Sequence, residues 1–167
     1  MTQRVVIADA GPLIALARIE ALYLLRQLFG RVCITTTVRD EILPAKAAFA
    51  DANLLVRMLA EGWIDVVALG QTDYRPLNPG VDAGEASSIQ LAKYWREAGH
   101  AVLLVMDDRA GRLEAKHLGL ALIGLNWSPN CGHHDWHEAL SMVGRFGRLR
   151  RTGTGRRWET RYSPQVL

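Results

Sequence analysis

The 167-residue sequence has little of what marks a secreted or membrane-bound protein. It has only two cysteines, Cys33 and Cys131, so no disulfide framework is expected and both thiols should be reduced. It has no run of 18 apolar residues, because Asp9 interrupts the longest such stretch, Val5–Ala17, and a membrane span is not expected. The first residues also lack the apolar segment and the cleavage site of a secretion signal. We therefore predict a cytoplasmic protein that does not bind a membrane.

The composition excludes a disordered, collagen-like or disulfide-stapled chain. Hydrophobic residues make up 49 % and charged residues 22 % of the sequence, which is ordinary for a globular protein. A chain of this length buries about 70 % of the surface that it exposes when unfolded, which is enough for a core of its own. With no internal repeat or low-complexity tract in the sequence, we expect about one domain.

The formal charge of +3 is unevenly distributed along the chain. Residues 1–125 carry 13 Lys and Arg against 14 Asp and Glu, whereas residues 126–167 carry seven Arg and three acids. We therefore divide the chain into a folded domain, 1–125, and an Arg- and Trp-rich tail, 126–167, and expect an anionic polymer as partner. Three interpretations of the tail stay open: a phosphate-binding arm, a mobile terminus, or an out-of-frame end of the gene. The tail also holds four residues of types that bind zinc, although their spacing matches no established zinc finger: Cys131, His133, His134 and His137.

Short aliphatic segments alternate with helical segments along residues 1–125. This alternation predicts a parallel sheet with helices on both faces. Gly30 and Gly99 are expected to end two helices, and Pro44 is expected to end another. The predicted strands are Val5–Ile7, Val32–Ile34, Ile64–Leu69 at a sheet edge, Ala101–Met106 and Leu120–Ile123. The predicted helices are a segment opening at Pro12, Glu20–Phe29, a short segment capped by Thr35–Thr37, Ala47–Glu61, Asp82–Ala98 and a segment from Asp108 to Leu118.

Acidic residues directly follow two of the predicted strands. Asp9 ends the first strand, and Asp107 and Asp108 end the fourth. Glu41 lies on the short helix after the second strand, and Glu85 lies on the first turn of the helix that precedes the fourth. Because ligands bind at the carboxyl ends of the strands of an open parallel sheet, we expect these acids from four distant segments to meet there.

A cluster of carboxylates at one place either takes up protons or binds a cation, since such groups within about 5 Å of one another repel by several kcal/mol. No cysteine or histidine accompanies these acids, and oxygen ligands alone favour Mg²⁺ or Mn²⁺ over zinc. A carboxylate-bound Mg²⁺ suits the hydrolysis of a phosphodiester bond. Each acid also has a purely structural interpretation. Asp9 would be a helix cap, Asp82 and Glu85 a capping box, and Glu41 a solvated helix residue, while Asp107 and Asp108 would favour the start of the next helix through their charge.

Four segments of the sequence resemble the PIN-domain nucleases. They are V5-V-I-A-D-A-G-P-L-I-A-L-A, V38-R-D-E-I, D82-A-G-E-A-S-S-I-Q-L-A and L103-L-V-M-D-D-R-A-G-R-L-E-A. The D-x-G-E-A segment and the paired aspartates are similar to the branch related to VapC toxins. The resemblance covers about residues 4–124. It implies an α/β fold, a three-layer α/β/α sandwich with a central, mostly parallel sheet, and the activity of a Mg²⁺- or Mn²⁺-dependent ribonuclease.

The resemblance also implies a role for each acid. Asp9 matches the first family acid, Glu41 the second and Glu85 the third. Asp108 is our match for the fourth, because its distance to the following glycine resembles the family spacing, and Asp107 stays an alternative. The implied catalytic residues are these five, and the implied metal ligands are Asp9, Glu85, Asp107 and Asp108.

Two arginines near the acids are candidates for contact with a substrate phosphate. They are Arg109 and Arg112, which could equally balance the acids or face solvent. Beside the first acid, where relatives often have serine or threonine, this chain has Ala10 and Gly11. The sequence also departs from the family pattern after Gly124, where the tail begins.

The leading hypothesis is a metal-dependent endoribonuclease that leaves 5′-phosphate and 3′-hydroxyl ends. The resemblance implies the toxin component of a type II toxin–antitoxin pair, with RNA as substrate and an antitoxin protein as partner, and we also expect a homodimer. The alternative is a catalytically impaired PIN-like module that binds RNA or antitoxin. A receiver-like phospho-acceptor domain is a third hypothesis, but the lysine and the D-x-D-x-T motif expected of related folds are missing.

Overall fold

The computed structural model describes residues 4–18, 20–45, 54–70 and 74–125, and all of them belong to one unit, residues 1–128. Predictions made for residues 47–53 and for the tail, 126–167, lie outside the described residues. The strands are β1 Arg4–Ala8, β2 Val32–Thr35, β3 Ile64–Val67, β4 Ala101–Val105 and β5 Leu122–Ile123. The helices are α1 Ala10–Arg18, α2 Tyr23–Phe29, α3 Thr36–Ala45, α4 Leu54–Ala60, α5 Ala83–Glu97 and α6 Arg109–His117.

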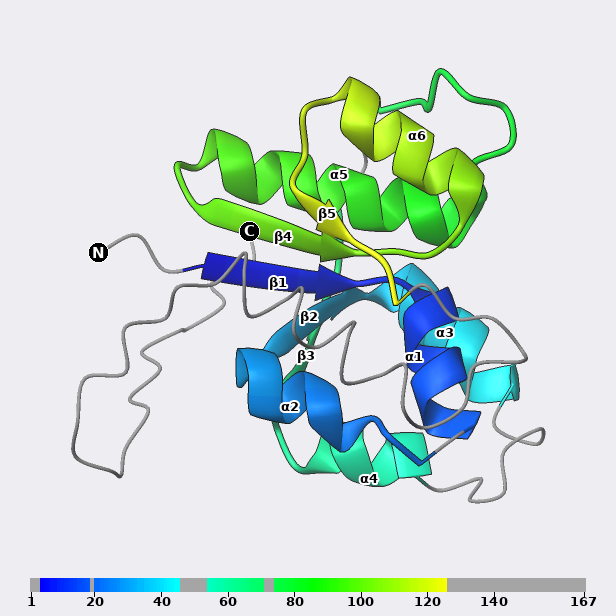
Figure 1. Cartoon of the computed structure of the whole chain (residues 1–167), viewed down its shortest axis with the longest axis vertical. Coiled ribbons are helices and arrows are strands. Elements are labelled where there is room, and N and C mark those ends of the chain that lie inside the picture. Colours follow the sequence, from blue (N-terminus) through cyan, green and yellow to red (C-terminus); the bar gives the residue numbers. More distant parts are fainter. Residues whose placement is uncertain (1–3, 19, 46–53, 71–73, 126–167) are drawn as a thin grey trace. The chain divides into compact units, whose positions relative to one another are not determined.

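The five strands form one sheet in the order β3-β2-β1-β4-β5, and every neighbouring pair is parallel. The strand β1 lies at the centre and runs in register with β4, with Ala8 opposite Val105 (Figure 1). The strand β3 lies at the edge, as its sequence predicts. The carboxyl ends of β1 and β4 therefore lie next to each other, which brings the residues that follow them to one place.

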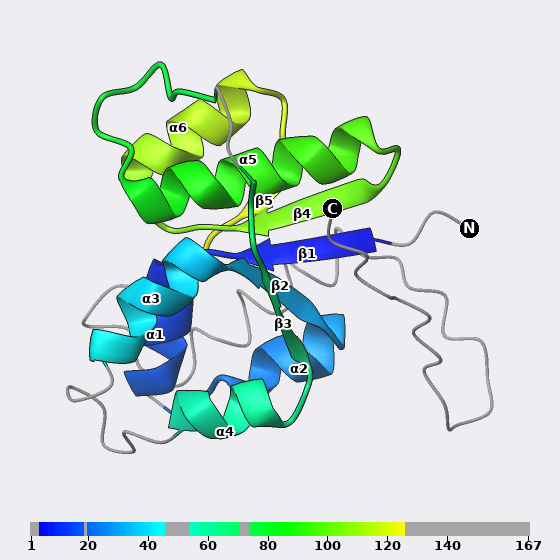
Figure 2. The same cartoon turned by 180° about the vertical axis from the view of Figure 1, so that it is seen from behind.

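Helices cover both faces of the sheet. On one face, α5 packs across β4, β1 and β2. In Figure 2, which shows the sheet from behind, α5 runs alongside β4. The helices α1 and α2 lie on the opposite side of the sheet, which faces the viewer in Figure 1. The predicted α/β sandwich with a parallel central sheet is confirmed.

The core follows from the apolar runs of the central strands. Ile7 and Leu104, which are paired across β1 and β4, are fully buried, and both belong to one hydrophobic cluster with Ile89 of α5. Strands that are buried on both faces need such continuous apolar sequences rather than alternating ones.

Within the described ranges, no helix is long and apolar enough to cross a lipid bilayer.

Three helix boundaries differ from their predicted positions. The helix α1 begins at Ala10 and not at Pro12, so the proline lies in the first turn. Backbone N–H groups have no partner within the helix there, and proline therefore costs no hydrogen bond. Glu20 has a left-handed backbone (φ 56°) that ends the first helical segment, so α2 begins only at Tyr23. Pro44 lies inside the last turn of α3, which ends one residue later. Gly30 and Gly99 have the positive φ predicted for residues that follow a helix.

Candidate active site

Asp9 lies at the junction of the two central strands. Its backbone N–H donates to the Val105 carbonyl of β4 at 3.0 Å, which fixes its position at the carboxyl edge of the sheet. Its side chain is buried, with only 5 % of the residue exposed. The Oδ1 atom accepts a hydrogen bond from the hydroxyl of Ser88 at 3.2 Å, and the carboxylate also accepts from the backbone N–H of Ala10.

The pKa of Asp9 is raised to about 6, well above its ordinary value of 3.8. Burial is the largest cause, because it removes water from the ionised form. The negative charges of Asp82 and Glu41 raise the pKa further. Asp9 therefore lies within electrostatic reach of acids from the loop before α5 and from α3.

Glu85 closes a capping box at the start of α5. Its backbone N–H donates to Asp82 Oδ1 at 2.8 Å, and its Oε2 accepts from the Asp82 backbone N–H at 3.1 Å. The structural interpretation of these two residues is thus confirmed as far as the cap is concerned. Glu85 is nonetheless only 4 % exposed, and burial, together with the charges of Asp82 and Asp108, raises its pKa to about 8.

Glu85 and Asp108 form a pair of interacting acids. Their side chains are hydrogen bonded to each other, and this bond raises the pKa of Glu85 and lowers that of Asp108. Burial opposes ionisation of Asp108, but N–H groups of Ala110 and Gly111 outweigh it, because both donate to Oδ1 as Asp108 caps α6. At neutral pH Glu85 therefore holds its proton.

Glu41 approaches the start of α5 from α3. Its carboxylate accepts a hydrogen bond from the backbone N–H of Gly84, and a Cβ atom on Gly84 would overlap both carboxylate oxygens. Burial of the carboxylate and the charge of Asp82 raise the pKa of Glu41. The residue as a whole stays exposed, so this side of the cluster faces solvent.

Asp107 faces a different part of the structure from Asp108. Its Oδ1 accepts from the backbone N–H of Leu125 at 2.6 Å, beside Gly124 and the guanidinium of Arg112. Asp107 therefore fixes the chain after β5, whereas Asp108 contacts Glu85. Of the five predicted catalytic residues, Asp9, Glu41, Glu85 and Asp108 interact with one another directly or through Asp82, while Asp107 is engaged by the segment after β5.

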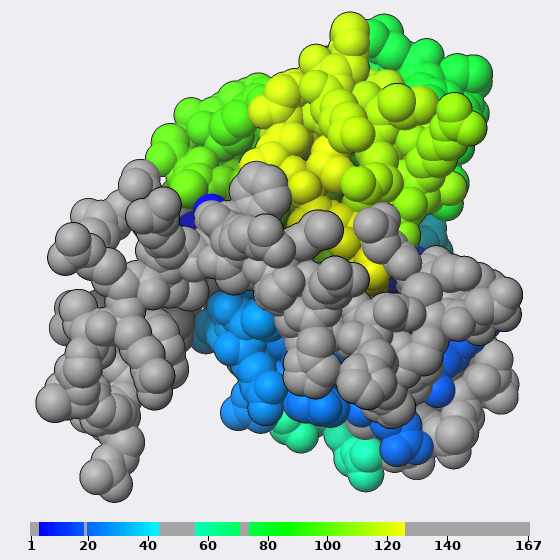
Figure 3. All heavy atoms as spheres, in the orientation of Figure 1, coloured from blue at the N-terminus to red at the C-terminus, as the bar shows by residue number. Residues whose placement is uncertain are grey.

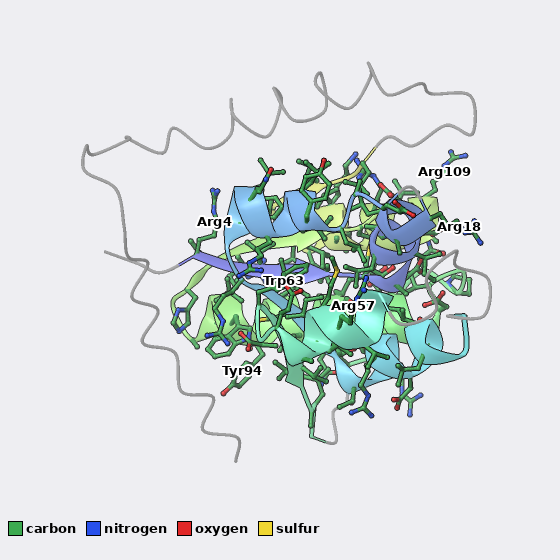
Figure 4. The ribbon with its side chains drawn as sticks, turned by 90° about the horizontal axis from the view of Figure 1, so that it is seen from below. Arg4, Arg18, Arg57, Trp63, Tyr94 and Arg109 are labelled. Carbon is green, nitrogen blue, oxygen red and sulfur yellow. The ribbon has the colours of Figure 1, made fainter. Side chains whose placement is uncertain are left out.

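The two arginines differ in their surroundings. Arg112 is half-buried and donates to the Met106 carbonyl at 2.9 Å. Arg109 is exposed at the start of α6, and in Figure 4 it projects at the end of the sheet opposite Arg4, the first residue of β1. The helix α6, which begins with Arg109, and the strand β5 lie at the top of the space-filling view (Figure 3). Of these two arginines, Arg109 is therefore the more exposed.

The donor set is composed of carboxylates, which suits a hard divalent ion such as Mg²⁺ or Mn²⁺. Across residues 4–18, 20–45, 54–70 and 74–125, no three His, Cys, Asp or Glu side chains are close enough to chelate an ion as they stand. Two of the carboxylates are instead turned to backbone N–H groups, Glu85 to Asp82 and Asp108 to Ala110. Rotation of these side chains away from their caps would be needed to gather ligands around one ion.

Sequence reasoning missed three residues that shape the site: Gly84, Ser88 and Gly111. Gly84 and Gly111 leave space for acids, since a Cβ on Gly111 would lie 3.1 Å from Glu85 Cδ and 2.5 Å from Met106 Sδ. Ser88 follows Glu85 by three residues, a spacing that puts both on one side of a helix. That spacing is a signal that could have pointed to Ser88.

A fourth missed residue is Glu114, a buried acid outside the cluster. It is 3 % exposed and accepts hydrogen bonds from the backbone N–H groups of Leu77 and Asn78 and from the Tyr74 hydroxyl. Burial opposes its ionisation, but these three donors outweigh burial and lower its pKa. Glu114 thereby holds the loop that leads to Asp82 against α6.

The parallel sheet of this strand order, with acids gathered at the carboxyl ends of β1 and β4, defines an α/β protein with an acidic site at its sheet edge. The chain belongs to the PIN-domain family, since the family model DUF3368, a PIN domain, matches residues 5–127. No curated protein matches the sequence. PIN domains are generally nucleases, and they generally use divalent metal ions.

Proposed function

We propose that this chain is a Mg²⁺- or Mn²⁺-dependent endoribonuclease that hydrolyses phosphodiester bonds of RNA. The observation that carries the proposal is the gathering of acids from β1, α3 and α5 at one edge of the sheet. Burial raises the pKa values of Asp9, Glu41 and Glu85, and the charge of Asp82 raises all three further. Such a concentration of carboxylates costs free energy of folding, and a divalent cation would remove that cost.

The acids of the cluster differ in their burial. Asp9 and Glu85 are almost fully buried, whereas Glu41 and Asp108 are exposed. We assign the ion to Asp9, Glu85 and Asp108, with Asp107 as the competing ligand. A divalent ion held there would activate water and neutralise the charge that develops on the scissile phosphate.

The chain's own residues would bind and orient the substrate. Arg109, exposed at the start of α6, is suited to contact a phosphate group next to the scissile one. Glu41, which lies on the solvent-facing side of the acid cluster, is suited to exchange a proton with the attacking water. In-line attack by water would leave a 5′-phosphate and a 3′-hydroxyl.

The choice of RNA and of a toxin role rests on the resemblance to the VapC-related branch, carried by the Asp82–Ala86 segment and the paired aspartates. We extend the proposal to the toxin component of a type II toxin–antitoxin pair, which acts as a homodimer and is inhibited by an antitoxin protein. Expression of the chain should then arrest growth of a bacterial host. Co-expression of a small protein encoded next to it should restore growth, and failure to arrest growth would contradict the toxin role.

The decisive experiment measures cleavage of a labelled single-stranded RNA by the purified full chain with Mn²⁺ or with EDTA. Cleavage is expected with Mn²⁺ and not with EDTA, and Glu41→Gln should lower the rate at least about 100-fold. The matched control is Asp40→Asn on the same helix, because Asp40 is exposed and pairs with Arg39. Asp40→Asn should leave the rate unchanged.

Three outcomes would contradict the proposal. Cleavage that persists in EDTA would exclude a metal-dependent reaction. Products that end in a 2′,3′-cyclic phosphate would exclude attack by water. Salt-dependent RNA binding without any turnover would favour the catalytically impaired binding module instead.

A further inference from the structure

Two adjacent serines of α5 use their hydroxyl groups in different ways. Ser87 donates back to the Gly84 carbonyl of its own helix at 2.7 Å, and its oxygen also lies 2.7 Å from the Thr35 hydroxyl. This is the usual bond of a serine inside a helix. Ser88 instead donates to Asp9 Oδ1 at 3.2 Å, across to the end of β1.

The contact between Ser88 and Asp9 is shielded from water. Ser88 is fully buried and Asp9 is 5 % exposed. Leaving a buried hydroxyl or carboxylate without a partner costs free energy, so the bond constrains the orientation of both side chains. Together with the backbone N–H of Ala10, which also donates to this carboxylate, the bond from Ser88 to Oδ1 fixes where the second carboxylate oxygen lies.

The first turn of α1 supplies no side-chain hydroxyl to Asp9. It begins with Ala10, Gly11 and Pro12, none of which has a side-chain donor. The hydroxyl comes instead from α5, the helix that carries Glu85 one turn earlier. One helix therefore carries an acid of the cluster and the hydroxyl that orients another acid, Asp9.

We infer that Ser88 is a positioning residue, which holds the Asp9 carboxylate so that its second oxygen can bind the divalent ion. This inference rests on the proposed function and extends it to a residue that does not itself touch metal or substrate. Residues that hydrogen bond to metal ligands typically change metal affinity or activity 10- to 100-fold when they are removed. The effect of Ser88 should therefore be on the affinity for the metal.

The test compares Ser88→Ala and Ser88→Cys with the wild-type full chain. The cysteine keeps nearly the volume of serine but is a weak donor, so a packing defect at this buried position is separated from the lost hydrogen bond. The control is Ile89→Val, the next residue of α5, which is fully buried and contributes only apolar contacts to the core. It lowers stability without touching a polar group of the site.

Two measurements are made on each variant: Mn²⁺ affinity by calorimetry without RNA, and the Mn²⁺ dependence of RNA cleavage. Both Ser88 variants should bind Mn²⁺ about tenfold or more weakly and need correspondingly more Mn²⁺ for half-maximal cleavage. The rate at saturating Mn²⁺ should stay within about threefold of wild type, since the metal ligands themselves are retained. Ile89→Val should bind Mn²⁺ as wild type does.

The possible failures are distinguishable. If wild type binds Mn²⁺ and cleaves RNA, and the Ser88 variants bind Mn²⁺ equally tightly, the role of Ser88 is overturned and the proposed function stands. A loss of maximal rate with unchanged affinity, or an equal loss of affinity in Ile89→Val, also overturns it. If wild type takes up no Mn²⁺, the proposed function falls and the inference about Ser88 falls with it.

Discussion

The carboxylate of Glu41 occupies the space that a methyl group on Gly84 would need. Gly84 is the second residue of α5, and its backbone N–H donates to that carboxylate. The close approach of α3 to α5 at this point thus depends on a missing side chain. Since Glu85 follows immediately, one glycine brings acids from two helices together.

Gly84→Ala should lower RNA cleavage by about 100-fold with little effect on folding. The added methyl group displaces the flexible end of Glu41 rather than backbone, and a misplacement of about 1 Å at an active site costs that much. Alanine is favoured over glycine in helices by up to about 1 kcal/mol, so the free energy of unfolding should be unchanged or slightly higher. Cleavage assays and urea unfolding measure the two effects.

Gly11→Ala in α1 is the matched control, since no atom lies within 4 Å of the added carbon. It should retain wild-type cleavage. Full activity of Gly84→Ala would show that the position of Glu41 does not matter for the reaction.

Asp9→Asn should abolish cleavage and increase stability at pH 8 in the presence of EDTA. The pKa of Asp9 is about 6 in the folded chain, against an ordinary value of 3.8, so the folded chain holds this proton more tightly than the unfolded chain. Ionisation of Asp9 therefore lowers the free energy of unfolding as the pH rises from 3.8 to about 6. Above pH 6 the full loss is up to about 3 kcal/mol. Asparagine removes that penalty and keeps an acceptor for Ser88.

The measurement is urea unfolding of wild type and Asp9→Asn at pH 4 and pH 8. The stability advantage of the variant should be present at pH 8 and absent at pH 4. Undiminished cleavage by the variant would remove Asp9 from the catalytic residues, and a variant less stable than wild type at pH 8 would contradict the electrostatic argument.

Binding of Mn²⁺ should stabilise the chain more strongly as the pH rises from 6 to 8.5. The ion competes with protons on Asp9 and Glu85, whose pKa values are about 6 and about 8. At a concentration 100 times the dissociation constant, the ion adds about 2.7 kcal/mol, which corresponds to roughly 5–11 °C in melting temperature. Thermal melts with Mn²⁺ and with EDTA at each pH test this, and equal shifts at pH 6 and pH 8.5 would contradict it.

Asp108→Asn should lower cleavage more than Asp107→Asn. Asp108 contacts Glu85, whereas one oxygen of Asp107 is bonded to the Leu125 backbone. Asparagine keeps an acceptor at both positions and is itself a good helix cap, so both variants should fold and differ mainly in charge. Cleavage rates of the two purified variants decide the matter, and the reverse order would assign the ligand to Asp107.

Glu114→Gln should destabilise the chain by about 1–3 kcal/mol at pH 7 and by less at pH 3.5. The three donors to Glu114 lower its pKa, so its stabilisation is present above the ordinary pKa of a glutamate and is lost as the pH falls. Urea unfolding at both pH values measures this loss.

The control for Glu114 is Glu61→Gln, which breaks only an exposed ion pair with Arg26 and should cost less than about 1 kcal/mol. A loss at Glu114 that does not depend on pH would show that its charge is unimportant for the loop it holds.

The fold could be predicted because local sequence marks its strands and helices. Apolar runs indicate the buried strands, and glycines indicate where helices end. The buried runs of β1 and β4 and the glycines after the helices needed no tertiary information. The start of α2 could not be predicted, because Glu20 adopts a left-handed conformation that its residue type does not favour.

The site could be predicted only as far as its elements. An acid that directly follows a strand lies at the carboxyl edge of the sheet. The sequence therefore predicted that Asp9 and Asp108 lie at the same edge. Which of two adjacent aspartates contacts Glu85 depends on the direction of each side chain after β4, which sequence does not determine. The contacts of Ser88 with Asp9 and of Gly84 with Glu41 depend on how α5 is rotated against β1 and α3.

The central position of β1 has a consequence for fragments of this protein. A cut between β3 and α5 would leave Asp9 and Glu41 on one piece and Glu85 with the aspartate pair on the other. Neither piece would hold a full set of acids, and each would expose one long side of an unfinished sheet. Each fragment alone would therefore be inactive. Activity would return only when the two fragments associate through the hydrogen bonds between β1 and β4.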